Sequence, residues 1–182
     1  MTPTSTPATP SQTAGPFLSI GTSWGALGAA VEAGVPGSFV LSGTVTDGAG
    51  APVTDALVEF WQADPSGRFP PETPDTWRGF TRALTDEGGT YRMRTLRPGR
   101  VACQAGLQAP HIDVSIFARG LLQRLVTRVY LGDEQEANAS DPVLASIADE
   151  ADRARLVAVS VPGGFRFDIA LQGPKETPFF VP

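Results

Sequence analysis

The chain has 182 residues, of which 41% are hydrophobic, and it carries a formal net charge of -5. This length suffices for one well-buried core, the acidic balance argues against a nucleic-acid partner, and no apolar run reaches the ~18 residues that a membrane span needs. The polar start at residues 1–14 does not look like a secretory signal, and Cys103, the single cysteine, has no internal disulfide partner. We therefore expect a protein of the reducing cytoplasm that contacts neither a membrane nor a nucleic acid.

Residues 1–37 differ in composition from the rest of the chain, because Thr, Ser, Pro, Ala and Gly dominate them and hydrophobic periodicity is weak. We expect an extended N-terminal arm there, with a short helix at residues 26–32. An arm of this length either docks on another surface or is disordered. Docking is favoured by four apolar residues, which are Phe17, Leu18, Ile20 and Trp24.

From residue 39 the pattern changes to alternating, β-branched segments that are separated by turns rich in Gly and Pro. Asp141 followed by Pro142 is typical of a helix start, so we expect a short helix at residues 141–148. This spacing predicts an all-β fold, an antiparallel β-sandwich with one or two short helices, that forms a single domain over residues 38–182. The expected strands lie at residues 39–47, 56–61, 90–95, 111–117, 125–131, 156–161 and 165–171.

His111 is the only histidine, which limits the chemistry that this chain can perform alone. A nucleophilic triad needs a histidine base, and neither a Gly-x-Ser-x-Gly segment nor a phosphate-binding loop is present. On a strand, His111 and Asp113 point to the same face, which could start a metal site. A two-histidine iron site or a catalytic zinc site needs further ligands. We therefore favour a packed histidine, hydrogen-bonded to Asp113 or to backbone, over an independent metalloenzyme.

Several segments in order along nearly the whole chain share one resemblance. They are TPSQTAGPF at residues 9–17, LVEFWQADPSGRF at 57–69, RTLRPG at 94–99, APHIDVSIFARG at 109–120, TRVYL at 127–131, RFDIALQG at 166–173 and ETPFF at 176–180. Together they resemble the intradiol ring-cleavage dioxygenase family. The first and the last two segments resemble the alpha subunits of those members that act on protocatechuate (3,4-dihydroxybenzoate).

The resemblance implies a metal site that this chain has lost. Catalytic chains of the family hold a non-haem ferric ion with two tyrosines and two histidines. At the matching positions this chain has Phe69 and Val101 in place of the tyrosines, keeps His111, and has Asp113 in place of the second histidine. We therefore predict that the chain binds no metal itself, and that the Fe(III) cofactor belongs to a homologous beta subunit in a hetero-oligomer of alpha-beta protomers.

The same resemblance implies a role for the arm at the partner's iron site. The holoenzyme would use O2 to cleave a small aromatic substrate, 3,4-dihydroxybenzoate, to 3-carboxy-cis,cis-muconate, and the arm would close the mouth of the site. Thr13 can donate a hydrogen bond to an anionic substrate, and Gly15 with Pro16 makes a rigid wall. Arg119 is expected near the same cavity, with a surface role as its alternative. The expected substrate-binding residues are Thr13, Ala14, Gly15, Pro16, Phe17 and Arg119.

A rival interpretation comes from residues 41–47 and 51–56. These segments also resemble small transthyretin-like β-sandwiches, which act as binding modules without enzymatic activity. The long arm and the full-length resemblance favour the dioxygenase subunit over such a module.

Overall fold

Strands dominate the computed structural model, which describes residues 9–15, 18–23, 27–70 and 77–181. Strand β1 shows why they form, because its residues alternate between buried and half-buried along the whole length, and Phe39, Leu41 and Val45 enter the core. The strands within these ranges are β1 (Ser38–Thr46), β2 (Leu57–Trp61), β3 (Phe80–Leu84), β4 (Thr90–Leu96), β5 (Val101–Cys103), β6 (Gly106–Gln108), β7 (His111–Phe117), β8 (Leu125–Leu131), β9 (Val157–Val161), β10 (Gly164–Arg166) and β11 (Ile169–Ala170).

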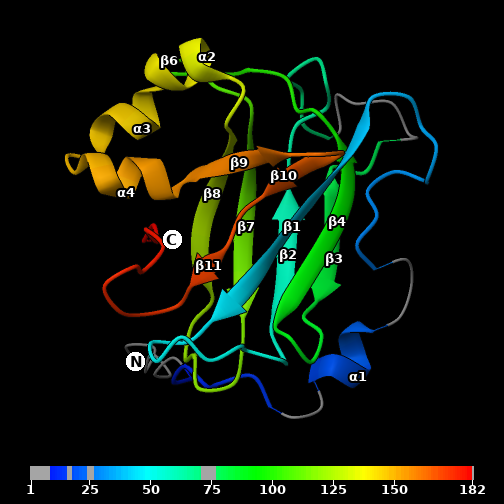
Figure 1. The fold of residues 1–182 in the computed structure, drawn as a ribbon, viewed down its shortest axis with the longest axis vertical. Helices are drawn as coiled ribbons and strands as arrows, with labels where there is room; N and C mark the ends of the chain where they lie inside the picture. The colour runs from blue at the N-terminus through cyan, green and yellow to red at the C-terminus, as the bar shows by residue number, and fades with distance from the viewer. Residues whose placement is uncertain (1–8, 16–17, 24–26, 71–76, 182) are drawn as a thin grey trace, which may run out of the picture.

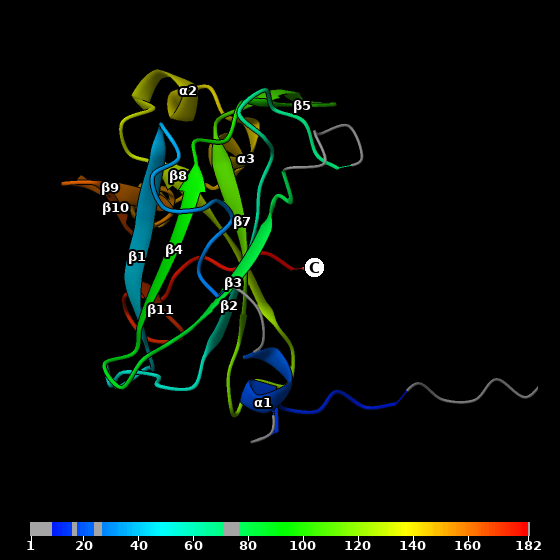
Figure 2. The same ribbon diagram turned by 90° about the vertical axis from the view of Figure 1, so that its right-hand side faces the viewer.

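A nine-stranded sheet follows the order β11-β1-β10-β9-β8-β7-β2-β3, with β4 also paired to β1, while β5 and β6 form a separate two-stranded sheet. Figure 2 shows β1 and β4 in one layer and β2, β3 and β7 in the other. Most neighbours are antiparallel, whereas the pairs β1–β10, β1–β11 and β8–β9 are parallel. The predicted all-β sandwich is confirmed, but its sheet is mixed and not purely antiparallel as expected.

The hydrophobic core lies between the two layers. Leu41 of β1 faces it from one side, and Ile112 and Ile116 of β7 face it from the other. The rings of Phe60 and Tyr91 meet across it, with centroids 5.6 Å apart. Burying a large apolar side chain stabilises the fold by about 1.5–3 kcal/mol. This packing therefore holds β7 in a fixed place along its length.

The helices are short and lie outside the sandwich: α1 (Leu18–Thr22), α2 (Gln135–Ala139), α3 (Pro142–Ser146) and α4 (Glu150–Arg155) (Figure 1). The predicted helix start at Asp141 is confirmed, because its side chain accepts hydrogen bonds from the backbone N–H of Val143 and Leu144. That helix ends at Ser146, two residues earlier than expected. Among the described residues, no helix is long and apolar enough to cross a membrane.

The predicted helix at residues 26–32 is wrong for the residues that the structure describes there. Residues 27 and 28 form a turn, and Ala29 makes a bridge to Arg94 of β4. The N–H of Gly28 donates to the carbonyl oxygen of Arg82 at 2.7 Å, and its own carbonyl oxygen accepts from the N–H of Arg94 at 2.7 Å. Gly28 also has a positive φ of 68°, where a side chain is strained. Pairing with neighbouring strands therefore replaces the local helical bonds.

The predicted last strand at residues 165–171 is interrupted into β10 and β11. Phe165, Phe167 and Ile169 are buried, so the expected inward face is correct. Between the two strands, the N–H of Phe167 still donates to the carbonyl oxygen of Ser42 at 2.8 Å. The side chain of Asp168 accepts from the N–H of Thr44 at 2.9 Å and takes the place of a regular ladder bond there.

Candidate functional site

The four positions matched to iron ligands gather only in part, at the His111 end of β7. His111 and Asp113 share one face of that strand, and Trp61 of β2 lies opposite Asp113 in the sheet register. The ring of Phe69 stacks on Trp61 with centroids 5.7 Å apart and an interplanar angle of 14°. Val101 lies in β5, whose only strand partner among the described residues is β6. The site therefore presents an aromatic stack beside a charged strand.

Asp113 is held by an arginine. It lies opposite Arg128 in the register of β7 and β8, and the Arg128 Nε donates to Asp113 Oδ1 at 2.8 Å. Both side chains are only partly exposed, which strengthens an ion pair relative to one in water. Burial alone would lower the pKa of Arg128, but the charge of Asp113 and the hydrogen bonds around the guanidinium raise it. The carboxylate that was expected in place of a histidine ligand is therefore already paired.

His111 is buried and bonded to backbone, which was one of the two expected arrangements. Its Nδ1 lies 2.8 Å from the carbonyl oxygen of Ala109. Because a carbonyl oxygen only accepts, Nδ1 must carry the proton and donate it. Burial lowers the pKa of His111, and the positive charge of Arg128 lowers it further. The imidazole is therefore neutral at pH 7 and packs beside the Tyr130 ring, with centroids 5.8 Å apart.

These residues do not fit a ferric ion. Phe69 and Val101 offer no donor atom, Asp113 is committed to Arg128, and His111 alone has a ring nitrogen that is not used by Ala109. Over the ranges that the structure covers, no group of three or more His, Cys, Asp or Glu side chains is arranged to hold a metal. A stable iron site needs several ligands together with their supporting contacts. No chemistry at this face can therefore be assigned to a metal bound by this chain.

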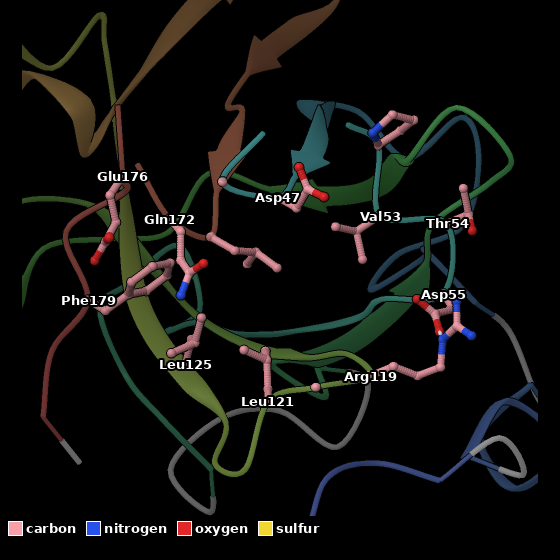
Figure 3. Close-up of a pocket in the computed structure, with 14 residues that line it drawn as sticks. Asp47, Val53, Thr54, Asp55, Arg119, Leu121, Leu125, Gln172, Glu176 and Phe179 are labelled. Carbon is pink, nitrogen blue, oxygen red and sulfur yellow. Dashed lines mark ion pairs between the residues drawn. The ribbon is translucent and has the colours of Figure 1, made fainter. Parts of the chain in front are cut away.

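A cavity of about 690 Å³ lies near the other end of β7 (Figure 3). Its walls come from the loop between β1 and β2, from the turn after β7, and from the C-terminal segment after β11. Arg119 and Asp55 form an ion pair on one side, and Leu121, Leu125 and Phe179 supply an apolar side. The cavity therefore combines charged groups with an apolar wall, as small-molecule sites commonly do.

The arm is attached beside this cavity. The N–H of Gly120, a cavity-lining residue that follows Arg119, donates to Thr13 Oγ1 at 2.8 Å. Ala14 follows Thr13, and the carbonyl oxygen of Gly15 accepts from the N–H of Leu18 at 3.1 Å, where α1 begins. The structure thus brings Thr13 and Arg119 to the same edge of the protein. The remaining two predicted arm residues, Pro16 and Phe17, lie outside the described residues.

The two groups of predicted site residues occupy opposite ends of β7. Strand β7 has seven residues, and a strand rises ~3.3 Å per residue, so its ends are roughly 20 Å apart. His111 and Asp113 lie at its start, whereas Arg119 and Gly120 follow its end. Thr13 and Arg119 therefore do not line the degenerate metal positions of their own chain.

The two ion pairs at these sites were not predicted from sequence. Arg128 could not be assigned to Asp113, because the cross-strand register that joins them is set by tertiary pairing. Asp55 was part of a segment considered only for its resemblance to transthyretin-like β-sandwiches, and its partner Arg119 is 64 residues further along the chain. A lone acidic residue in a turn gives no signal of such a long-range ion pair.

A protein-family match defines the class to which this chain belongs. Residues 30–173 match a family model described as dioxygenase. The chain therefore belongs to the dioxygenase family, and the predicted family is confirmed. Intradiol dioxygenases, to which the relatives below belong, are iron-dependent.

Curated relatives show which dioxygenase chains this chain is similar to. The chain is 39% identical to the protocatechuate 3,4-dioxygenase alpha chain of Pseudomonas putida, over 96% of each chain. It is 40% identical to that of Burkholderia cepacia, over 94% of this chain and 96% of the relative. It is also 34% identical to the beta chain of the Burkholderia cepacia enzyme, over 77% of this chain and 66% of the relative. Both kinds of chain thus share this fold family.

A solved structure supports the same fold. The dioxygenase domain of a dioxygenase carbohydrate-binding protein fusion from Streptomyces sp. SirexAA-E superposes with a TM-score of 0.61. It is 26% identical, over 90% of this chain and 97% of that domain. The catechol 1,2-dioxygenase of Pseudomonas arvilla C-1 gives a TM-score of 0.59 at 22% identity, over 80% of this chain and 55% of the enzyme.

Proposed function

We propose that this chain is the iron-free alpha subunit of a protocatechuate 3,4-dioxygenase. A homologous beta subunit holds the Fe(III), and the pair forms the repeating unit of a hetero-oligomer. The enzyme adds both atoms of O2 to 3,4-dihydroxybenzoate and opens the ring between the two hydroxyl-bearing carbons, which gives 3-carboxy-cis,cis-muconate. The observation that carries the proposal is the similarity to alpha chains along nearly the full length, at 39% and 40% identity.

The state of the degenerate metal positions supports the division of roles. Asp113 is paired with Arg128, and Phe69, whose ring is stacked on Trp61, has no atom that could bind a metal. A chain that lacks its own centre contributes to the reaction through the surface that it offers to a partner. We therefore assign the iron chemistry to the beta subunit and the shaping of the substrate pocket to this chain.

The arm and Arg119 are the proposed contribution to that pocket. The proposed chain division is the arm at residues 1–37 and the sandwich at 38–182. The geometry of Thr13 supports this role, because a hydroxyl has one donor and two acceptor positions, and Gly120 N–H uses an acceptor position. The hydroxyl proton stays free for a substrate carboxylate, which the nearby charge of Arg119 attracts. The proposed substrate-binding residues are Thr13, Ala14, Gly15, Pro16, Phe17 and Arg119.

The separation along β7 supports action on a second chain. Thr13 and Arg119 lie roughly 20 Å from the His111 end of their own β7, because the seven-residue strand extends between them. They can serve a metal centre only if that centre belongs to a neighbour. The neighbour that we propose is a homologous beta subunit, because this chain is also similar in sequence to the beta chain of the Burkholderia cepacia enzyme.

Co-expression with a homologous beta subunit tests the proposal. The complex should contain iron, absorb in the visible range through tyrosinate-to-iron(III) charge transfer, and consume O2 with 3,4-dihydroxybenzoate. The chain purified alone should lack the colour and the activity. A stoichiometric, tightly held iron on the isolated chain would overturn the assignment of the metal to the partner.

The transthyretin-like binding module is the weaker alternative. It accounts for residues 41–47 and 51–56 but leaves unexplained a family match over residues 30–173. If the module interpretation were right, adding this chain to the beta subunit would leave ring cleavage unchanged. We also propose a cytoplasmic location, because the exposed Cys103 is unpaired, as is usual in a reducing compartment.

A further inference from the structure

Asp55 lies at the end of a loop that is firmly tied to its surroundings. Within the loop between β1 and β2, Asp47 Oδ1 accepts from the N–H groups of Ala49 and Ala51, both at 2.9 Å. The N–H of Val53 donates to the carbonyl oxygen of Val45 at 2.9 Å. Directly after Asp55, the N–H of Ala56 donates to Thr85 Oγ1, also at 2.9 Å. The backbone that carries Asp55 is thus bonded on one side to β1 and on the other to Thr85, directly after β3.

The side chain of Asp55 forms an ion pair with the turn that follows β7. Its Oδ2 pairs with the Nε of Arg119, whose side chain is 72% exposed. An arginine so exposed keeps most of its rotamer freedom unless a fixed partner orders it. Figure 3 shows the two side chains directed toward each other from the β1–β2 loop and from the turn after β7. Because the ion pair uses Nε, the two Nη groups of the guanidinium retain donors for a second anion.

The same turn carries the attachment point of the arm. Arg119 and Gly120 are consecutive, and the Gly120 N–H donates to Thr13 Oγ1 at 2.8 Å. A shift of the Arg119–Gly120 peptide would therefore move the guanidinium and the Thr13 hydroxyl together. The β1–β2 loop thus holds Asp55, and the ion pair of Asp55 holds Arg119. The next residue, Gly120, then holds Thr13 through a hydrogen bond.

We propose that Asp55 is a positioning residue that preorganises Arg119 and, through Gly120, Thr13 for the carboxylate of the substrate. This inference rests on the proposed function, because it concerns the substrate of the partner's site. Asp55 does not touch the substrate. It removes in advance the freedom that Arg119 and the arm would otherwise lose on binding, and such preorganisation raises affinity.

Kinetics of the co-expressed complex test the effect on the substrate. Asp55→Asn should raise KM for 3,4-dihydroxybenzoate by about 2- to 5-fold, the range expected for a partly exposed ion pair, with little change in kcat. With 4-methylcatechol, which has no carboxylate, KM should be unchanged. Asp55→Glu should restore most of the affinity. Asp152→Asn is the matched control, because Asp152 is about as exposed as Asp55 and also forms an ion pair, with Arg155 on α4.

Two kinetic outcomes would overturn the inference. A lower KM for 3,4-dihydroxybenzoate in Asp55→Asn would mean that Asp55 competes with the substrate for Arg119. An equal loss with both substrates would mean that the substitution damages the pocket in general.

Hydrogen exchange at the Gly120 amide gives a readout that does not need activity. This N–H is protected by Thr13 Oγ1, so a looser turn should exchange faster. We expect Asp55→Asn, but not Asp152→Asn, to speed exchange at Gly120 in the full-length chain within the complex, without substrate. Unchanged exchange in an active complex would refute the positioning role of Asp55. Faster exchange in a complex without ring-cleavage activity would support the positioning of the arm and would refute the proposed function instead.

Discussion

Replacing Thr13 by alanine removes one hydroxyl from the arm and leaves its backbone intact. In the structure this hydroxyl accepts the Gly120 N–H at 2.8 Å. Under the proposed function it donates its own proton to the carboxylate of the substrate. A neutral hydrogen bond contributes roughly 0.5–1.5 kcal/mol, and one to a charged group up to ~3 kcal/mol. Thr13→Ala should therefore lower kcat/KM for 3,4-dihydroxybenzoate by about 3- to 100-fold, and the carboxylate of the substrate favours the upper part of that range.

The assay is steady-state ring cleavage by the co-expressed complex at matched iron loading. Iron content and assembly should be unchanged, because Thr13 is not a metal ligand. Thr13→Ser is the control, since it keeps the hydroxyl and loses only a methyl group. Deleting residues 1–17 should reduce kcat/KM further, because it also opens the pocket to water. Wild-type kcat/KM in the truncated complex would show that the arm plays no part at the active site, even with the family assignment intact.

Three further predictions concern the degenerate metal positions and assembly. Restoring the ligands by Phe69→Tyr, Val101→Tyr and Asp113→His should not produce an active single chain. The reason is that Arg128 would lose its partner and that the contacts which support a metal site are missing. Ring cleavage by the isolated variant would contradict this prediction. The free energy of unfolding should fall as pH drops below about 6.5, by at most ~1.4 kcal/mol per pH unit from His111, because the unfolded state binds a proton that the buried imidazole resists. Urea unfolding at pH 7.5 and 5.5 measures this, and an equal pH dependence in His111→Gln would refute it. The interface with the beta subunit should bury more than ~2,000 Å², so a fully stable monomer in sedimentation that gains no thermal stability from the partner would argue against it.

The sequence predicted those strands that have one buried face and a regular alternation. In β7, Ile112, Val114 and Ile116 are all buried, and their spacing is visible in the sequence alone. Strand β3 was missed because its inward residues are Thr81 and Ala83, which give little hydrophobic signal. The β5–β6 hairpin was missed because neither strand has a buried residue, so no alternation exists to be detected.

Tertiary contacts decided what could not be predicted. The segment near Gly28 was expected to be helical, yet its backbone bonds go to Arg82 and Arg94 on strands far along the chain. At the metal positions the replaced ligands were visible residue by residue. The ion pair that now holds Asp113 was not, because it depends on the register of two strands. Local pattern thus indicated which groups are present, and the three-dimensional pairing determined which of them interact.

The distance between the two ends of β7 bears on gene dosage. Under the proposed arrangement, each active centre needs one product of the alpha gene and one of the beta gene, and each arm reaches a single neighbouring centre. An oligomer assembled from normal and arm-deleted alpha chains would then lose activity in direct proportion to the defective fraction. A damaged arm would therefore remove only the activity of the centre that it serves. The centres that are served by intact chains in the same oligomer would keep their activity.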